Sequence, residues 1–442
     1  MKQCLLAAAL AIGLAAPAVA VDEPPMQLPS PTGPATGLAD SAGLRATVFG
    51  TPPQDIAPLP AKVPLVEMDL ALPWRLPVPA VFWFDRRLRV WFSAQDRPAP
   101  LAIVIAGTGG SGNNPRQQTL RAVLYGAGYH VLTMPSPTFP GFIVAASSTG
   151  VAGDLMQDGH DLYAAMREIV AHLPPKVRIT DIDVLGYSLG GANAVIVKSI
   201  DAVEQKLHVH RALMINPPVS IFSSVGRLDK LYAITLGQGD AGVERFYQQL
   251  YAAIANRYRA SDVVQVDEDF LLSAAALILT TDAQFSAAIA LTFRMALVNM
   301  FFAGDLYSGA GVVLDPKHPP KVGDSLEPIA VALRSKQFSE YFARIFAPYY
   351  VRRRPGTSAD SLIAENSLAV IGDALRGDPD YYAQTNRDEL ILDKAELEWL
   401  EATLGSRIAV YDHGGHLGNL GDRQQATDML AMLGGRWKAD TQ

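Results

Sequence analysis

Short apolar runs typical of buried strands alternate along this chain with longer segments in which apolar residues recur at helical spacing. The expected strands cover residues 101–106, 129–134, 179–185, 211–215, 380–384 and 407–411. The expected helices cover residues 116–125, 153–173, 189–200, 394–404 and 423–433. Strands that are joined by crossover helices form parallel sheets with both faces covered. The alternation therefore predicts an α/β fold with a mostly parallel sheet and helices on both of its faces.

The alternation stops after the strand at 211–215 and returns only at residue 380. The segment between is rich in alanine and leucine and has mostly helical patterns. We therefore expect residues 220–378 to form a helical cap, inserted between the two parts of one α/β core, residues 65–219 and 379–442. A chain of 442 residues is long enough for a large core and such an insertion.

Two features precede the core. Residues 80–84 (AVFWF) and 88–92 (LRVWF) are short β-type runs on either side of Asp85-Arg86-Arg87, which predicts a β-hairpin. Residues 21–64 are rich in Pro, Gly, Ala and Thr, and prolines remove backbone donors and fix an extended backbone. This segment is predicted to be a linker or a loosely held arm.

The first 20 residues have the parts of a secretory signal peptide. Lys2 gives a short positive start, residues 5–16 form an apolar core, and Ala18-Val19-Ala20 is an A-x-A cleavage site. We expect cleavage after Ala20, a mature N-terminus at Val21, and a periplasmic or extracellular protein.

The single cysteine of the chain, Cys4, lies before the apolar core of the leader, whereas a lipoprotein cysteine would follow it directly. The mature chain is therefore expected to contain no cysteine. Disulfides, a thiolate nucleophile and cysteine-ligated metals are excluded together.

Composition excludes further classes of protein. The formal net charge is -7 with a sequence pI near 5.6, and no basic cluster suggests a nucleic-acid partner. Residues 270–304 are strongly apolar, but Asp282 and Arg294 interrupt them, and charges are costly in hydrocarbon. We expect two cap helices here, with a cap for the second at Thr280-Thr281-Asp282, and no stable transmembrane anchor.

One stretch, residues 184–191 (VLGYSLGG), leads an apolar strand directly into a Gly-x-Ser-x-Gly turn and a helix. A serine hydroxyl is a poor nucleophile unless a base lies within hydrogen-bond reach and a third group orients that base. A sharp strand-to-helix turn exposes the serine, and glycines at 186 and 190 let the strand and helix pack closely around it. The pattern alone is short, but its position between a strand and a helix favours Ser188 as a nucleophile.

This segment resembles the nucleophile elbow of the α/β-hydrolase superfamily. The resemblance covers about residues 95–217 and 378–435. It implies three further features: an oxyanion loop after an earlier strand, an acid after a late strand, and a histidine near the C-terminus.

The loop AGTGGSG follows the first core strand, where the resemblance places the oxyanion hole. Many members of the family have His-Gly at its first two positions, and this chain has Ala106-Gly107. The resemblance implies backbone N–H donors from Thr108, or from Gly109, and from Leu189. A phosphate-binding loop is the alternative, but no Gly-Lys-Ser/Thr follows and the G-x-G-x-x-G pattern is not met.

Among eight histidines, two lie in the loop after the last expected strand, in the sequence YDHGGHLGN. His416 stands in the Gly-Gly-His form that many family members share, and the resemblance implies that it is the general base. His413 is the local alternative. A zinc site at this H-x-x-H pair lacks a third ligand, and we expect neither a metal nor an organic cofactor.

The acid is expected after the strand at 380–384, in the sequence TNRDEL. Asp388 is favoured as the acid, and Glu389 is the alternative. If neither residue is catalytic, the segment is simply a charged surface turn. The earlier position that some members of the family use, residues 214–218 (MINPP), holds no carboxylate. The order Ser188, Asp388, His416 is the order that this fold requires.

Together these residues imply an exported serine hydrolase that cleaves carboxylic esters through an acyl-enzyme. The apolar cap segment suggests an apolar pocket that binds the acyl group, and a small-molecule or lipid-like ester substrate. A peptidase or an acyltransferase would use the same residues, and a non-catalytic binding protein of the cell envelope would keep the same fold.

Overall fold

The computed structural model describes residues 34–235, 248–249, 252, 278–333 and 336–435. The expected leader, its cleavage site and the first of the two helices expected within 270–304 lie outside the described residues.

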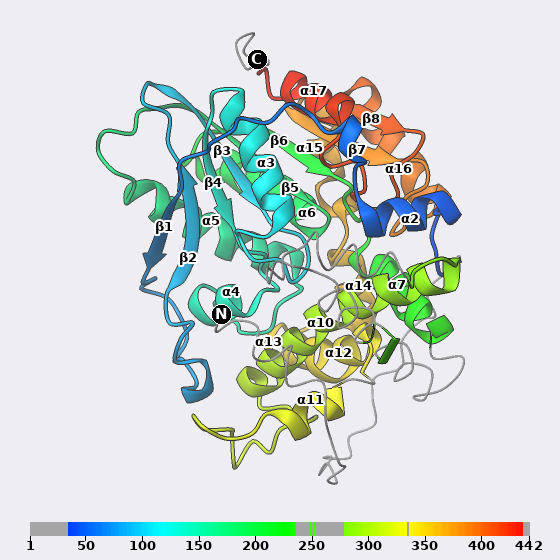
Figure 1. Cartoon of the computed structure of the whole chain (residues 1–442). Helices are drawn as coiled ribbons and strands as arrows, with labels where there is room; N and C mark the ends of the chain where they lie inside the picture. Colours follow the sequence, from blue (N-terminus) through cyan, green and yellow to red (C-terminus); the bar gives the residue numbers. More distant parts are fainter. Residues whose placement is uncertain (1–33, 236–247, 250–251, 253–277, 334–335, 436–442) are drawn as a thin grey trace.

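The described residues form one eight-stranded sheet in the order β1-β2-β4-β3-β5-β6-β7-β8 (Figure 1). β2 pairs antiparallel with both β1 and β4, and the pairs from β4 to β8 are all parallel. The strands are β1 (Val66–Leu70), β2 (Leu88–Ser93), β3 (Ala99–Ile105), β4 (His130–Met134), β5 (Ile179–Tyr187), β6 (Val209–Ile215), β7 (Tyr381–Asn386) and β8 (Ile408–Tyr411).

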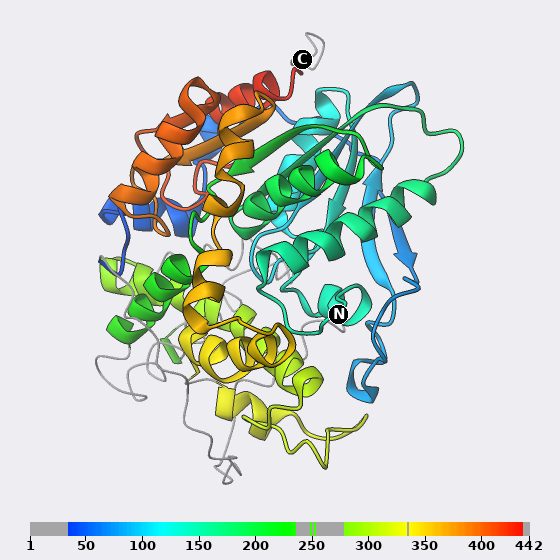
Figure 2. The ribbon, with the colours of Figure 1, turned by 180° about the vertical axis from the view of Figure 1, so that it is seen from behind.

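Helices cover both faces of this sheet (Figures 1 and 2). The side chains of β3 alternate between the faces, as the pleat requires: Ile103 packs in the core beneath α5, α6 and α16, and Val104 packs beneath α3 and α17. The fold class expected from the alternation is therefore confirmed. These helices are α3 (Pro115–Gly126), α5 (Leu155–Ala171), α6 (Leu189–Glu204), α16 (Lys394–Leu404) and α17 (Arg423–Met432).

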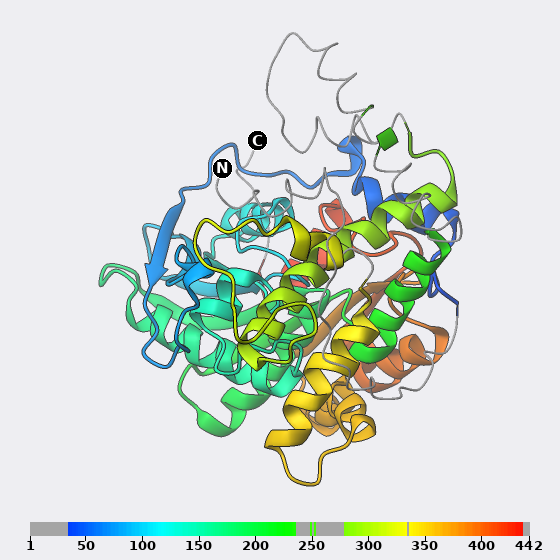
Figure 3. The same cartoon turned by 90° about the horizontal axis from the view of Figure 1, so that it is seen from below.

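A group of helices from the inserted segment lies across one end of the sheet (Figure 3). They share a third apolar core, separate from the two cores of the sheet, in which the long helix α10 is central. The helices of this cap are α7 (Ile221–Thr235), α10 (Asp282–Ser308), α11 (Glu327–Leu333), α12 (Phe338–Tyr341), η5 (Phe342–Phe346), α13 (Ala347–Arg353) and α14 (Ala359–Glu365). The next elements along the chain, η6 (Leu368–Ile371) and α15 (Gly372–Gly377), pack against the sheet again. Leu368 and Leu375 belong to a core of the sheet.

Helix α10 begins where the sequence indicated. Thr281 caps it, and the Thr281 and Gln284 side chains form a reciprocal capping box. By length and composition α10 could cross a membrane, but 72% of its most apolar stretch is buried inside the protein. Among the described residues it is therefore the core helix of the cap.

The hairpin expected at residues 80–92 is wrong. Residues Ala80–Phe82 form a 3₁₀ turn, and β2 pairs instead with β1, at Leu88↔Leu70 and Phe92↔Val66. The Trp83 N–H donates to the Ala80 carbonyl (3.2 Å) and the Asp85 N–H to the Phe82 carbonyl (2.9 Å), so these backbone groups form local turns instead of a strand ladder.

The expectation of a loosely held arm is also wrong for residues 34–64. Helix α2 (Ser41–Phe49) forms there, capped by the Asp40 side chain, which accepts a hydrogen bond from the Gly43 N–H. The segment docks on the core: the Ala57 N–H donates to the Gly421 carbonyl (2.9 Å), and α2 lies beside α10 and the C-terminal part of the core (Figure 1).

Candidate active site

Ser188 stands at the turn between β5 and α6, in a backbone conformation that only a sharp turn requires. Its φ is 55° and its ψ is -130°, a strained combination for a residue with a side chain. A Cβ at Gly186 would clash with the Gly190 carbonyl, and a Cβ at Gly190 would clash with the end of β3. Glycine is thus needed at both positions, and the turn presents Ser188 at the end of the sheet that the cap covers.

His416 faces this serine. Its Nε2 lies 3.0 Å from Ser188 Oγ, and both side chains are almost fully buried. His413 is exposed in the same loop, so the geometry favours His416 as the base. The Ser188–His416 pair expected from the sequence is therefore brought together.

The carboxylate that contacts the imidazole belongs to Glu389. Its Oε1 lies 2.8 Å from His416 Nδ1, and it also accepts a hydrogen bond from the Ile391 N–H (3.2 Å). Glu389 is fully buried. A carboxylate at Nδ1 fixes the tautomer with the proton on Nδ1, which leaves Nε2 free to accept the proton of Ser188.

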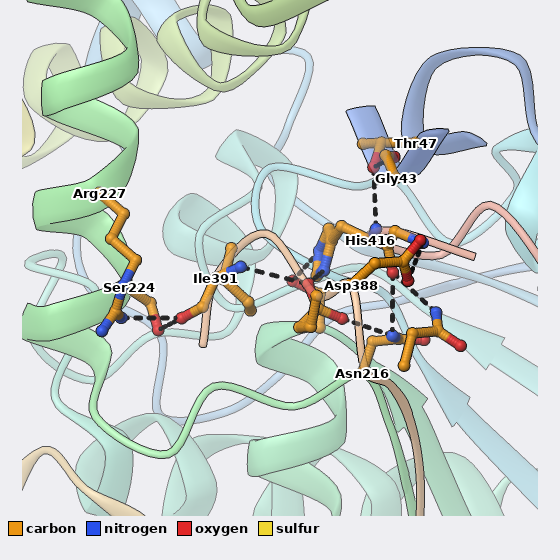
Figure 4. Close-up of polar contacts among 12 residues, drawn as sticks. Gly43, Thr47, Asn216, Ser224, Arg227, Asp388, Ile391 and His416 are labelled. Carbon is orange, nitrogen blue, oxygen red and sulfur yellow. Dashed lines mark hydrogen bonds and ion pairs between the residues drawn. The ribbon is translucent and has the colours of Figure 1, made fainter. Parts of the chain in front are cut away.

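Asp388 does not occupy the place expected for the acid. Its two carboxylate oxygens accept the backbone N–H groups of Gly415 (2.8 Å) and Gly414 (3.1 Å), as Figure 4 shows. Burial raises the pKa of Asp388, and these two backbone donors lower it in part. Neighbouring side chains of the loop point in different directions, so Asp388 holds the backbone before His416 while Glu389 reaches the ring.

Two residues with unused backbone N–H groups lie beside the serine. Among the described residues, neither the Thr108 amide nor the Leu189 amide donates to another protein group, and both residues line the pocket beside Ser188. The N–H of Gly109, the alternative donor, already donates to Thr138 Oγ1 (2.8 Å). Thr108 and Leu189 are therefore the candidates for an oxyanion hole.

The loop around Thr108 is anchored without the histidine common in the family. Asn114 donates from Nδ2 to the Ser111 carbonyl (2.7 Å) and lies 2.9 Å from the hydroxyl of Tyr187, the residue before the nucleophile. The Ser136 N–H donates to the Gly110 carbonyl (3.0 Å). The side chain beside the nucleophile and the oxyanion loop therefore hold each other in position.

Helix α2 contacts the backbone of His416, and the sequence did not predict this contact (Figure 4). Thr47 Oγ1 accepts the His416 backbone N–H (2.8 Å) and donates to the Gly43 carbonyl (2.8 Å). A Cβ at Gly415 would clash with Gly43, and a Cβ at Gly43 would lie 3.0 Å from Asp388 Oδ2. The helix fits this closely only because both positions are glycine. No motif in the N-terminal segment signals this contact.

A pocket of about 790 Å³, counted with its open mouth, adjoins Ser188 and extends under the cap. No charged side chain is among the described residues that line it. Aromatic side chains from α7, α10, α12 and η5 form part of its wall: Phe222, Phe293, Phe338, Tyr341, Phe342 and Phe346. Phe293 also lies over His416, with ring centroids 6.2 Å apart, so α10 covers the base directly. Such a wall suits an uncharged, apolar group.

Among the described residues, no three His, Cys, Asp or Glu side chains group closely enough to hold a metal ion. The side chains that meet at Ser188 are the His416 imidazole and, on its far side, the Glu389 carboxylate.

Neither the protein-family models nor the curated proteins contain a match to this chain, but it is similar to solved structures. The chain is similar to a thioesterase domain from the curacin biosynthetic pathway, with 12% identity, TM-score 0.39, and coverage of 84% of this chain and 99% of that one. It is also similar to a Pyrococcus furiosus esterase (10% identity, TM-score 0.35, coverage 84% and 90%). A third structure is the haloalkane dehalogenase of Bradyrhizobium elkani USDA94 (11% identity, TM-score 0.38, coverage 84% and 99%). Because these TM-scores are below 0.5, the assignment of the fold depends on the strand order and the serine turn of this chain.

Proposed function

We propose that this protein is a serine hydrolase that cleaves carboxylic esters through an acyl-enzyme intermediate. The observation that carries the proposal is the continuous chain of contacts from Ser188 Oγ to His416 Nε2 (3.0 Å) and from His416 Nδ1 to Glu389 Oε1 (2.8 Å). The proposed triad is therefore Ser188, His416 and Glu389.

In the first step, Ser188 Oγ attacks the ester carbonyl while its proton passes to His416 Nε2. The charge that develops on the carbonyl oxygen is stabilised by the Thr108 and Leu189 N–H groups, and Glu389 stabilises the imidazolium. His416 then returns the proton to the leaving alcohol as the C–O bond breaks. Water attacks the acyl-enzyme with His416 again as base, and this step releases the acid and restores Ser188.

An apolar acyl group is the proposed occupant of the pocket under the cap. The aromatic wall and the absence of charged lining side chains among the described residues support this choice. Apolar side chains would stabilise each buried methylene by about 0.8 kcal/mol. Specificity for acyl length should therefore come from the cap.

Export is part of the proposal and is supported by the sequence of the leader. A protein purified from the periplasm or medium should begin at Val21, and mass spectrometry of its N-terminus would test this. Recovery of chains that begin at Met1 from the cytoplasm alone would argue against export.

Covalent labelling by a fluorophosphonate tests the reaction type. The wild-type protein should be labelled at Ser188, Ser188→Ala should not be labelled, and hydrolysis of p-nitrophenyl esters should fall by about 10⁴-fold or more in that variant. A folded wild-type protein that neither reacts with the probe nor hydrolyses esters would instead be a non-catalytic member of this fold. Peptidase or acyltransferase activity would show as labelling without ester hydrolysis in water alone.

A further inference from the structure

Asn216, the residue that follows β6, has a strained backbone. Its φ is 47°, in the left-handed region that residues with side chains rarely adopt, although Asn does so more readily than most. The Asn216 N–H donates to the Gln384 carbonyl of β7 (2.7 Å), which fixes the residue between the two strands. Strain of this kind persists where the surroundings impose it, and it is concentrated at functional sites.

The side chain of Asn216 points at the acid. Its Nδ2 lies 2.5 Å from Glu389 Oε2, and Figure 4 shows it beside the loop that carries His416. Asn216 Oδ1 is buried and has no hydrogen-bond partner among the described residues. Asn216 Nδ2 also donates to the Gly415 carbonyl (3.5 Å). Turning the amide over would set its oxygen against both acceptors, so Glu389 and the Gly415 carbonyl fix the orientation that directs the donor at Glu389.

Glu389 thus divides its two oxygens between two tasks. Oε1 receives His416 Nδ1 and the Ile391 N–H, and Oε2 receives the Asn216 amide. A fully buried carboxylate is unfavourable in its charged form unless donors bind it. In the described chain, His416 is the one titratable side chain that contacts this carboxylate.

Other charged groups lie near the acid loop without contacting the Glu389 carboxylate. Asp388 is turned to the Gly414 and Gly415 N–H groups, and Arg227 of α7 reaches the Ile391 carbonyl (3.0 Å). Asp40 of the N-terminal segment lies close enough to Asp388 to raise its pKa. The Asn216 amide is therefore the neutral donor that holds the second oxygen of Glu389.

We propose that Asn216 is a positioning residue for catalysis: its amide keeps Glu389 aimed at His416 Nδ1, which holds the imidazole in the tautomer that accepts the serine proton. This inference rests on the proposed hydrolase function. The sequence hides it because Asn216 occupies the place where some members of the family carry the acid itself, and an amide there suggests no role.

Two substitutions test the role. Asn216→Asp keeps the shape but removes the donor and sets a second carboxyl against Glu389, and two touching carboxyls retain a proton between them. Asn216→Gly accepts the same φ and removes the donor without adding charge. In both variants we expect kcat to fall about 10- to 100-fold with KM unchanged, the value of one hydrogen bond to a charged group.

Asn419→Asp is the matched control. It makes the same isosteric change in the His416 loop, but the Asn419 amide donates to Asn386 Oδ1 (2.8 Å) and not to Glu389. Its kcat and KM should stay at the wild-type values.

A wild-type kcat in Asn216→Asp would overturn the proposal. So would a loss of activity that matches a loss of folded protein, because packing alone would explain it. Proton NMR of the resting protein provides a readout that needs no activity: the Nδ1–H signal of His416 should be downfield in the wild type and in Asn419→Asp, and shifted or absent in Asn216→Asp. If the wild type resists fluorophosphonate, the proposed function fails, while this NMR comparison still tests Asn216.

Discussion

Replacing Glu389 by Gln separates the roles of the two adjacent carboxylates. The carboxylate binds donors on both sides, with the Ile391 N–H and His416 Nδ1 at Oε1 and the Asn216 amide at Oε2. A Gln side chain has only one oxygen for these two positions. With the oxygen at the first position, its NH₂ group meets the Asn216 donor. With the amide turned, its NH₂ group faces His416 Nδ1 and favours the wrong tautomer.

The size of the effect follows from this geometry. The loss of the carboxylate removes both the correct tautomer and the stabilisation of the imidazolium, and a comparable change in a serine protease triad costs about 10⁴ in kcat. We therefore expect kcat of Glu389→Gln to fall about 10⁴-fold, or about 5.5 kcal/mol in the barrier. Asp388→Asn keeps one of the two backbone hydrogen bonds to Gly414 and Gly415 and loses the other, which should cost about 1–3 kcal/mol of stability. Its kcat should stay within about tenfold of the wild type.

The assay is hydrolysis of a p-nitrophenyl ester, with melting temperatures of all three proteins to correct for unfolded material. Residual activity of Glu389→Gln near the wild-type value would show that this carboxylate does not orient the base. A kcat loss for Asp388→Asn as large as that for Glu389→Gln, at equal folded fraction, would return the acid to Asp388.

Substitutions that test three other features, the support of the base by α2, the acyl pocket and the buried Asp158, have definite expected outcomes. Thr47→Val should lower kcat without raising KM, because the His416 N–H loses its acceptor, whereas Thr47→Ser should keep activity near that of the wild type. Equal activity of the two variants would show that α2 does not support the base. Met300→Asp places a charge in the pocket and should weaken hydrolysis of long-chain esters far more than hydrolysis of acetate esters. Met295→Asp, at an exposed position of the same helix, should have no such effect. A wild-type kcat/KM that does not change from acetate to decanoate esters would contradict the acyl pocket. Burial raises the pKa of Asp158 well above its usual value, so the folded protein binds a proton that the unfolded chain releases, and stability should fall as pH rises above about 4. Asp158→Asn should remove this part of the pH dependence in melting curves, and an unchanged dependence would show that Asp158 is ionised in the folded protein.

The strands and helices of the core follow from the sequence because each depends on local pattern. The expected helix at 394–404 has those bounds, and its capping box, Asp393 with Glu396, is a local signal. The proposed nucleophile and base, which the structure brings to 3.0 Å of each other, could also be located in the sequence, because the serine turn needs glycines at fixed positions and the Gly-Gly-His loop has a recognisable form. By contrast, the choice between Asp388 and Glu389 depends on which way each of two adjacent side chains leaves a loop. That direction is set by contacts with Gly414, Gly415 and Asn216, all distant in the sequence.

The N-terminal segment shows the same limit more strongly. Nothing in a Pro- and Gly-rich stretch indicates that Thr47 accepts a hydrogen bond from the His416 backbone, 369 positions away. The same helix reaches the cap, since Ser41 Oγ donates to Asp282 Oδ1 (2.6 Å) at the start of α10, and Phe49 packs edge-on against Phe285 (5.8 Å). Helix α2 therefore contacts both the loop that carries the base and the helix that covers the pocket. Any movement of α10 that opens the pocket must strain or break these contacts, so the position of the cap and the position of His416 are mechanically linked through α2.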